Sequence, residues 1–345
     1  MFKLIDKIAE EKKATKEELL LLINNHSPEN YEYLAKKARK VRESIYGKKI
    51  FIRGLIEISS YCKNDCYYCG LRRSNSCAER YRLTKEEILA CCDEGYPLGF
   101  RTFVMQGGED AYFTDEVLTD IVSSIKKKYP DCAVTLSVGE RSMDSYKKLK
   151  EAGADRFLLR HETANCEHYA KLHPKEMTLQ NRMNCLASLK KLGFQTGCGF
   201  MVGSPYQTLQ NIVDDILFIS EFKPEMIGIG PFIPHEKTPF KDEPAGSVDL
   251  TLYLLTILRL LNPNALIPAT TALGTLQTDG RERGILSGAN VIMPNLSPVA
   301  TRKKYMLYNG KLASGEEAAE GLLKLKESMK KIGYEIVTDR GDFSK

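Results

Sequence analysis

The chain has 345 residues, with 50 Lys and Arg against 45 Asp and Glu, so its formal net charge is only +5. This length suits one large α/β barrel or two average domains, and the small charge, spread without a Lys/Arg block, argues against nucleic acid as a partner. Because the N-terminus lacks the apolar core of a signal peptide and its longest apolar run, 19–23, is too short to cross a bilayer, we expect a cytoplasmic protein with no membrane partner and with its ten cysteines reduced.

Residues 4–46 show two helical patterns. Thr15-Lys-Glu-Glu18 is a capping box that opens a Leu-rich stretch. Ser27-Pro28 opens a second helix that runs to about Tyr46, where Gly47 ends it. We assign residues 1–48 to an N-terminal helical extension.

From residue 50 onward, short apolar runs alternate with amphipathic helical stretches, as in successive βα units. The predicted strands are 50–58, 102–105, 133–138, 156–159, 196–201, 226–229, 265–268 and 290–293. The predicted helices lie near 84–95, 114–128, 142–151, 178–192, 208–222, 248–262 and 279–287. This alternation predicts an α/β fold, a closed (β/α)8 TIM-type barrel over residues 49–310, with an open six-stranded partial barrel as the alternative. Residues 311–345 are predicted to form a C-terminal segment with a helix near 316–332.

Three cysteines, Cys62, Cys66 and Cys69, follow the first predicted strand with the spacing Cys-x3-Cys-x2-Cys. Three thiolates bind three irons of a 4Fe-4S cluster and leave the fourth iron open to a small molecule that is reduced there. Zinc is the competing interpretation, but a structural zinc site normally has a second ligand pair about a dozen or more residues on, and no such pair follows Cys69. Since no cysteine follows Cys198, we expect one cluster only.

The loops that follow the strands carry polar and glycine-rich sequences. In a parallel barrel these loops meet at the face where such barrels have their active sites. They include Gln106-Gly-Gly-Glu109, Ser137-Val-Gly-Glu140, Arg160-His-Glu-Thr163, Gly203-Ser-Pro205, Gly228-Ile-Gly-Pro231, Thr270-Thr271 and Met293-Pro-Asn295. Glycines at 107 and 108 let the backbone approach a bound molecule closely.

The cysteine spacing, with the aromatic Tyr68 before the last cysteine, resembles the radical S-adenosylmethionine (SAM) enzymes. The resemblance implies that the methionine amine and carboxylate of SAM chelate the fourth iron, and that one electron cleaves the sulfonium to give a 5′-deoxyadenosyl radical. It also implies that Arg182 pairs with the cofactor carboxylate and that Glu162 accepts its ribose hydroxyls. The expected cofactor-binding residues are Tyr68, Gly107, Gly108, Glu109, Ser137, Glu162, Arg182, Ile233, Met293 and Tyr305.

Four longer strings narrow the resemblance. They are Arg160-His-Glu-Thr-Ala-Asn165, Gly228-Ile-Gly-Pro-Phe-Ile-Pro-His235, Ile267-Pro-Ala-Thr-Thr-Ala272 and Ala289-Asn-Val-Ile-Met-Pro-Asn295. They closely resemble the HydE family of FeFe-hydrogenase maturases, over roughly residues 10–310. This resemblance implies a role in building the two-iron subcluster of the hydrogenase, on an organometallic iron precursor that carries CO, cyanide and cysteine. It further implies an external one-electron donor and transient contact with other maturation proteins.

An anionic iron complex inside a barrel needs positive and hydroxyl groups around it. The residues expected to contact this substrate are Arg53, Gln106, Thr135, Arg160, Met226, Thr270 and Thr271, which fall at predicted strands or their ends. Tyr308, where the chain passes the barrel mouth, is expected to act catalytically beside the three cysteines.

Two other functions stay open. A methylornithine synthase-like lysine mutase shares the single cluster and the barrel, but it needs contacts for the ammonium and carboxylate of a free amino acid, and the Arg160–Asn165 string argues against it. A non-catalytic iron-sulfur carrier belongs to a different class. Such a carrier would release no 5′-deoxyadenosine from SAM.

Overall fold

Three helices, rather than the expected two, precede the barrel. In the computed structural model, which describes residues 1–312 and 319–344, these are α1 (Phe2–Glu11), α2 (Lys16–Asn24) and α3 (Pro28–Tyr46). Thr15 and Ser27 cap α2 and α3 as predicted, by accepting backbone N–H bonds of the first turn. No start signal marks α1 in the sequence, because Met1 makes no side-chain cap, and burial of Ile5 and Ile8 stabilises this helix instead.

The strands form a closed ring of parallel pairings. They are β1 (Lys49–Ile52), β2 (Gly54–Ser59), β3 (Thr102–Gly107), β4 (Ala133–Ser137), β5 (Arg156–Leu158), β6 (Gln195–Cys198), β7 (Met201–Val202), β8 (Met226–Ile227), β9 (Gly230–Pro231) and β10 (Val291–Ile292). The sheet order is β2-β3-β4-β5-β6-β8, β7 pairs with β9, and β10 pairs with β1. Bridges from Met226 to Leu266 and from Pro268 to Val291 complete the ring. The predicted closed barrel is therefore confirmed, although the seventh strand is reduced to these bridges and the first is interrupted at Arg53.

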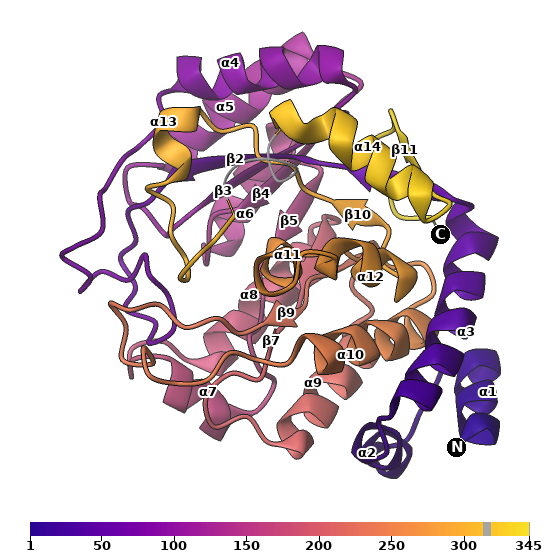
Figure 1. Ribbon diagram of the computed structural model, residues 1–345. Coiled ribbons are helices and arrows are strands. Elements are labelled where there is room, and N and C mark those ends of the chain that lie inside the picture. The colour runs from indigo at the N-terminus through magenta and orange to yellow at the C-terminus, as the bar shows by residue number, and fades with distance from the viewer. Residues whose placement is uncertain (313–318, 345) are drawn as a thin grey trace.

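Helices cover the outside of the ring (Figure 1). The predicted ones are α4 (Lys85–Gly95), α5 (Asp115–Lys128), α6 (Met143–Glu151), α8 (Leu179–Lys191), α9 (Leu209–Phe222), α10 (Val248–Leu261) and α12 (Gly280–Leu286), each within a residue of its expected ends. The unpredicted ones are η1 (Tyr96–Leu98), α7 (Cys166–Leu172), α11 (Thr271–Leu276) and α13 (Val299–Arg302), whereas η3 (Ala319–Gly321) falls within the helix expected near 316–332. The N-terminal extension packs on this outer layer, α3 along α10 and α2 against α9.

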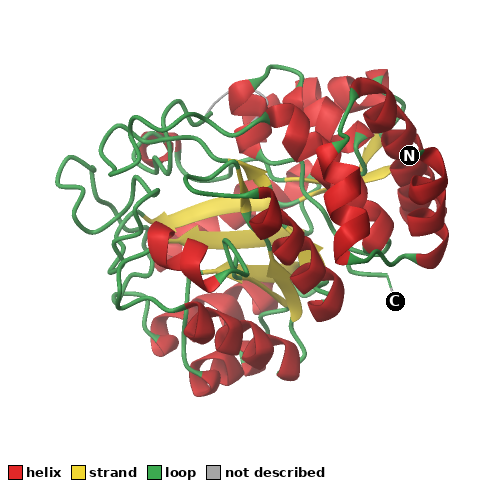
Figure 2. Ribbon diagram, turned by 90° about the horizontal axis from the view of Figure 1, so that it is seen from below, coloured by secondary structure: helices red, strands yellow, loops and turns green. Residues whose placement is uncertain are grey.

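The C-terminal segment closes the end of the barrel where the strands begin. The predicted helix is α14 (Leu322–Lys331), and the start expected near 316 falls at 313–318, outside the described residues. An unpredicted strand, β11 (Glu335–Val337), then pairs with β1. The buried Arg156 guanidinium donates to the Arg340 and Gly341 carbonyls (2.8 and 3.1 Å) and to Asp342 Oδ1 (2.7 Å). These bonds seal one end, whereas the long loops gather at the other (Figure 2).

Two apolar cores support this barrel. The larger lies between the strands and the helices, and the smaller lies inside the ring around Phe51, Met226, Leu266 and Val291. Within residues 1–312 and 319–344, no helix has the length and apolar character needed to span a membrane.

Candidate active site

The loop that carries the three cysteines is packed between two other segments. Gly70 donates its N–H to the Leu307 carbonyl (2.8 Å), and a Cβ at this position would lie 2.2 Å from the Met306 carbonyl oxygen. Only glycine fits there. On its other side, Tyr67 donates its N–H to the Leu172 carbonyl (3.0 Å). The cysteines are therefore held at the loop-bearing end of the barrel.

The three cysteines suit the ligands of an iron-sulfur cluster. All are half-buried, and burial raises the pKa of the Cys62 and Cys66 thiols and brings that of Cys69 to about 12. The positive irons of a cluster supply the charge that thiolates need in such surroundings. In the described part of the chain, no three His, Cys, Asp or Glu side chains converge on one metal ion. Cluster ligands need no such convergence, because each binds a different iron.

The β3 loop lies against the cysteine loop, as its glycines predict. A Cβ on Gly108 would lie 2.2 Å from the Tyr61 carbonyl oxygen, so a side chain cannot be accommodated. The Glu109 carboxylate extends toward the β4 loop, where Oε1 accepts the N–H of Glu140 (3.0 Å), and Oε2 lies 3.2 Å from Lys63 Nζ. The backbone of this loop, rather than the Glu109 carboxylate, is thus available to a cofactor.

Arg182 lies beside the cysteine loop, but its guanidinium is already paired. Its Nε donates to Glu140 Oε1 (2.5 Å), and its Nη1 donates to the Arg160 carbonyl. Burial raises the pKa of the Cys66 thiol, and the positive charge of Arg182 opposes that rise. Arg182 therefore favours the thiolate form of Cys66. Glu140 was not among the expected site residues. The sequence signal that could have identified it is its place at the end of a strand, in the string Ser137-Val-Gly-Glu140.

Glu162 enters the barrel mouth from the end of β5 with an unusual backbone. Its φ of 64° lies in the left-handed region, which non-glycine residues seldom adopt. The side chain is buried, and its Oε2 lies 3.1 Å from Arg160 Nη2. These two predicted site residues therefore form an ion pair within the mouth.

The hydroxyls of the expected aromatic residues Tyr68 and Tyr305 have different hydrogen-bond partners. The Tyr68 hydroxyl lies 3.2 Å from His173 Nε2. Tyr305 is buried, and its hydroxyl accepts from Gln106 Nε2 (3.4 Å), which joins a predicted cofactor residue to a predicted substrate residue. Burial raises the pKa of the Tyr308 hydroxyl to about 12.

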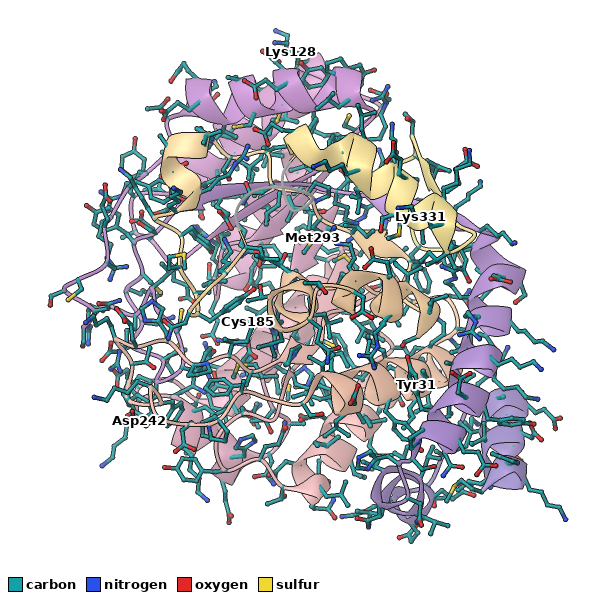
Figure 3. The ribbon with its side chains drawn as sticks, viewed as in Figure 1. Tyr31, Lys128, Cys185, Asp242, Met293 and Lys331 are labelled. Carbon is teal, nitrogen blue, oxygen red and sulfur yellow. The ribbon has the colours of Figure 1, made fainter. Side chains whose placement is uncertain are left out.

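The other predicted cofactor residues lie at strand ends. Ser137 is the last residue of β4 and is half-buried. Ile233 is buried shortly after β9, and Met293 directly follows β10. Met293 packs against the apolar cluster inside the ring and lies near the middle of the molecule in Figure 3.

Unpaired polar atoms line the barrel interior. Arg53 donates Nη1 to Met226 Sδ (3.1 Å), but its Nε and Nη2 find no hydrogen-bond partner among the described residues. Thr135 Oγ1 and Arg160 Nε are unpaired in the same part of the chain. Burial lowers the pKa of Arg53 well below its usual value. Because buried polar atoms normally have partners, this group marks a place for a polar ligand or water.

Thr270 and Thr271 follow the seventh predicted strand, and a helix that the sequence did not predict begins there. Thr271 begins α11 and Thr270 precedes it. The seventh strand makes only single bridges, and the chain turns into a helix directly after them. Thr270 Oγ1 is also without a hydrogen-bond partner in the described residues.

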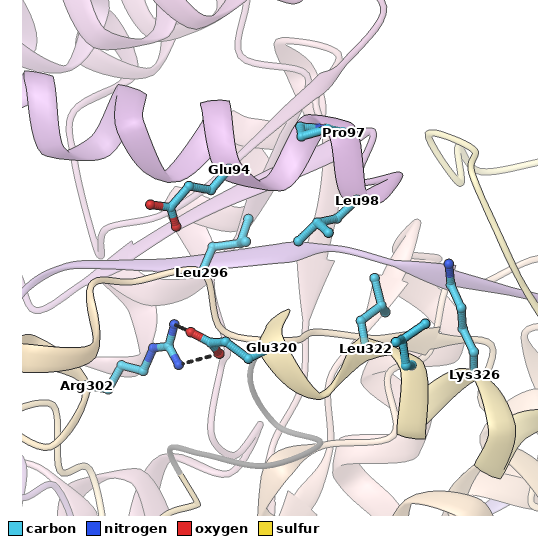
Figure 4. Close-up of a pocket in the computed structure, with 9 residues that line it drawn as sticks. Glu94, Pro97, Leu98, Leu296, Arg302, Glu320, Leu322 and Lys326 are labelled. Atoms are coloured by element: carbon cyan, nitrogen blue, oxygen red, sulfur yellow. Dashed lines mark hydrogen bonds and ion pairs between the residues drawn. The ribbon is translucent and has the colours of Figure 1, made fainter.

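Two surface hollows lie outside this interior. One, of about 490 Å³, runs between α4, η1 and α14 and is lined by Leu98, Leu296 and Leu322, with the Arg302–Glu320 ion pair at its edge (Figure 4). None of the predicted site residues lines it. The other, of about 220 Å³, borders the outer side of the cysteine loop at Gly70.

Comparison with known proteins shows the family of this chain and its fold. The model of the Radical SAM superfamily matches residues 56–219. The [FeFe] hydrogenase maturase subunit HydE of Thermotoga maritima is 49% identical over 286 residues, 83% of this chain and 81% of that protein. The crystal structure of methylornithine synthase (PylB) has a TM-score of 0.81 at 27% identity, covering 97% of both chains. That of HydG, a maturase of the [FeFe]-hydrogenase, has a TM-score of 0.79 at 22% identity, covering 96% of this chain and 74% of that one, and shows the shared fold.

Proposed function

The chain belongs to the HydE family of radical SAM enzymes, and from this premise we propose that it acts in building the two-iron subcluster of FeFe hydrogenase. One observation carries the proposal. In the same barrel as three cysteines suited to a cluster, buried nitrogen atoms of Arg53 and Arg160 and the Thr135 hydroxyl have no hydrogen-bond partner among the described residues. A polar, anionic substrate inside the barrel would supply those partners.

Enzymes of this family use a 4Fe-4S cluster and SAM, which when bound supply a 5′-deoxyadenosyl radical by one-electron cleavage of the sulfonium. We propose that Cys62, Cys66 and Cys69 hold three of the irons. The backbone of the Gly107–Gly108 loop then faces the methionine amine. Glu162 accepts the ribose hydroxyls, and this contact competes with its ion pair to Arg160.

Arg182 pairs with the cofactor carboxylate in this proposal. Arg182 Nε already bonds Glu140 and Nη1 bonds the Arg160 carbonyl, so the cofactor carboxylate would approach Nη2. The bond to Glu140 fixes the orientation of the guanidinium plane. Tyr68, Ile233, Met293 and Tyr305 complete the surroundings of the adenosyl group. Met293 directly follows β10, and Tyr305 lies in the segment after α13.

The substrate in this proposal is an organometallic iron complex with cyanide, CO and cysteine ligands. Its hydrogen-bond donors are Arg53, which follows β1, Thr135 of β4 and Arg160, which follows β5. The remaining wall is lined by Gln106, Met226, Thr270 and Thr271. A buried guanidinium without a carboxylate partner is costly, and an anionic ligand offsets that cost. Tyr308 lies at the mouth, where it contacts the substrate or the adenosyl group.

The partners proposed for this activity are an external one-electron donor and the other hydrogenase maturation proteins. The donor is needed because each reductive cleavage of the SAM sulfonium consumes one electron. Transient contact with a maturase that produces the iron complex would keep this reactive complex from water.

Two measurements test the proposed function. Anaerobically reconstituted protein, reduced with dithionite, should release 5′-deoxyadenosine from SAM, whereas a carrier would release none. In a cell-free hydrogenase maturation mixture that lacks HydE, addition of the wild-type chain should restore H₂ evolution, and an Arg160→Met variant should not. Conversion of lysine to methylornithine without restored H₂ evolution would favour the mutase, whose solved structure is the 27% identical relative.

A further inference from the structure

A buried histidine lies between the two residues that point into the barrel mouth. His161 is fully buried, and its ring faces away from the mouth toward Phe218 of α9, with ring centroids 4.8 Å apart. Arg160 and Glu162, on either side of it, form the ion pair inside the mouth. The His161 ring therefore packs toward α9, on the side of the segment opposite the Arg160–Glu162 ion pair.

The bonds of His161 fix which ring nitrogen carries the proton. The Gly199 N–H donates to His161 Nδ1 (3.2 Å), so the ring proton is on Nε2. Nε2 lies 3.4 Å from Asp215 Oδ1, and Asp215 is fully buried on α9. Burial lowers the pKa of His161 to about 3 and raises that of Asp215, so burial disfavours the charged form of both groups.

The same two neighbours also hold the backbone around Glu162. Glu162 donates its N–H to the Gly199 carbonyl (3.0 Å), so Gly199 binds this segment through both its N–H and its C=O. Asp215 Oδ1 accepts the Ala164 N–H (2.5 Å), two residues further on. The left-handed φ of Glu162 is unfavourable for a residue that has a Cβ, and it persists only where its surroundings fix it.

We infer that His161, backed by Asp215, is a positioning residue that holds Glu162 in its left-handed conformation, so that the carboxylate faces the cofactor. This inference rests on the role of Glu162 toward SAM that is proposed above. His161 does not contact the cofactor itself, because its ring lies on the opposite face of the segment. The expected effect of its loss is therefore on the affinity for SAM and not on the cluster.

The test measures SAM binding to anaerobically reconstituted, unreduced protein by isothermal titration, which needs no turnover. H161L removes both ring nitrogens, and we expect the dissociation constant for SAM to rise between about tenfold and a hundredfold, with iron content unchanged. H161N keeps an acceptor at the Nδ1 position and should stay within about threefold of wild type. E162A defines the effect of losing the carboxylate itself.

His168 provides a matched control, because it is also buried and its ring also bonds the backbone of a distant residue, in this case through Nε2 to the Pro205 carbonyl (3.0 Å). H168L should lower the melting temperature without changing the SAM dissociation constant. If H161L does not fold, D215A takes its place with the same expected rise.

Two outcomes separate the inference from the proposed function. If E162A weakens SAM binding while H161L or D215A leaves it unchanged, the positioning inference is overturned and the proposed cofactor site stands. If E162A itself leaves the SAM dissociation constant unchanged, the proposed role of Glu162 fails, and the inference fails with it.

Discussion

Lys311 Nζ lies 2.5 Å from Glu57 Oε1, and both side chains are almost completely buried. Glu57 belongs to β2, just before the cysteine loop, whereas Lys311 follows the segment that carries Tyr305 and Tyr308 across the mouth. Asn295 Nδ2 donates to the other Glu57 oxygen (2.9 Å). This ion pair therefore ties the mouth segment to the first strand. In the sequence, a carboxylate inside the apolar stretch Ile56-Glu57-Ile58 indicates a buried charge that needs a partner. The partner, Lys311, lies 254 positions away in the chain.

Replacing Lys311 by Met leaves the Glu57 carboxyl buried without its cation. We expect the free energy of unfolding at pH 7 to fall by about 3 kcal/mol, measured by urea unfolding. Burial already raises the pKa of Glu57, and the substitution raises it further. A carboxyl with a higher pKa in the folded than in the unfolded state binds more protons when folded, so the stability of K311M should fall as pH rises from about 5 to 8.

The control for K311M is K324M, at an exposed lysine of α14, which should change the free energy of unfolding by less than about 0.5 kcal/mol. A K311M protein as stable as wild type at pH 7 would show that the ion pair does not hold the mouth segment.

Gly108→Ala should disturb the cysteine loop, because the new Cβ would lie 2.2 Å from the Tyr61 carbonyl oxygen. We expect a loss of about 1–3 kcal/mol in the free energy of unfolding and weaker SAM binding. Gly228→Ala is the matched control, since a Cβ at this position would lie 4.0 Å from its nearest neighbour, the Cys198 carbonyl oxygen. If G108A and G228A changed the free energy of unfolding and SAM binding equally, the close approach of Gly108 to the Tyr61 carbonyl would not be what the cysteine loop requires.

Cys66→Ala should abolish the cluster, whereas Cys77→Ala should not. Both cysteines follow β2 within the same stretch of chain, but Cys77 is exposed and lies outside the Cys-x3-Cys-x2-Cys spacing. Iron analysis after anaerobic reconstitution should find about four irons per chain in wild type and C77A. Retention of the full iron content and of SAM cleavage by C66A would contradict the assignment of the ligands.

Arg182→Met removes the guanidinium that bonds both Glu140 and the Arg160 carbonyl. We expect SAM affinity to fall about tenfold or more, because a charge-assisted contact to the cofactor carboxylate is lost. Glu140→Gln keeps an acceptor for Arg182 and should reduce SAM affinity by less. Isothermal titration with SAM distinguishes the two variants, and equal losses would mean that Arg182 acts only through Glu140.

Arg160→Lys retains a positive charge but loses the planar fork of the guanidinium. In the maturation mixture it should slow H₂ recovery about tenfold or more while leaving SAM cleavage intact, because Arg160 is proposed to contact the substrate and not the cluster. Loss of SAM cleavage in this variant would instead place Arg160 with the cofactor.

The sequence by itself determined the features that depend on local patterns. Caps such as Thr84 and Thr114 accept backbone N–H groups within three residues, so the ends of α4 and α5 were predictable. The cysteine spacing lies within eight residues and needs no long-range contact to indicate a cluster. The barrel followed from the alternation of strands and helices.

Only the tertiary structure decided how distant residues meet. The pairing of Arg182 with Glu140, the ion pair of Lys311 with Glu57 and the closure of the barrel end by residues 340–342 all join segments far apart in the chain. The short helix α11 was not predicted, and it begins directly after the single bridges that form the seventh strand position. The left-handed backbone of Glu162 likewise depends on Gly199 and Asp215, whose contacts with it arise from packing and leave no local sequence pattern.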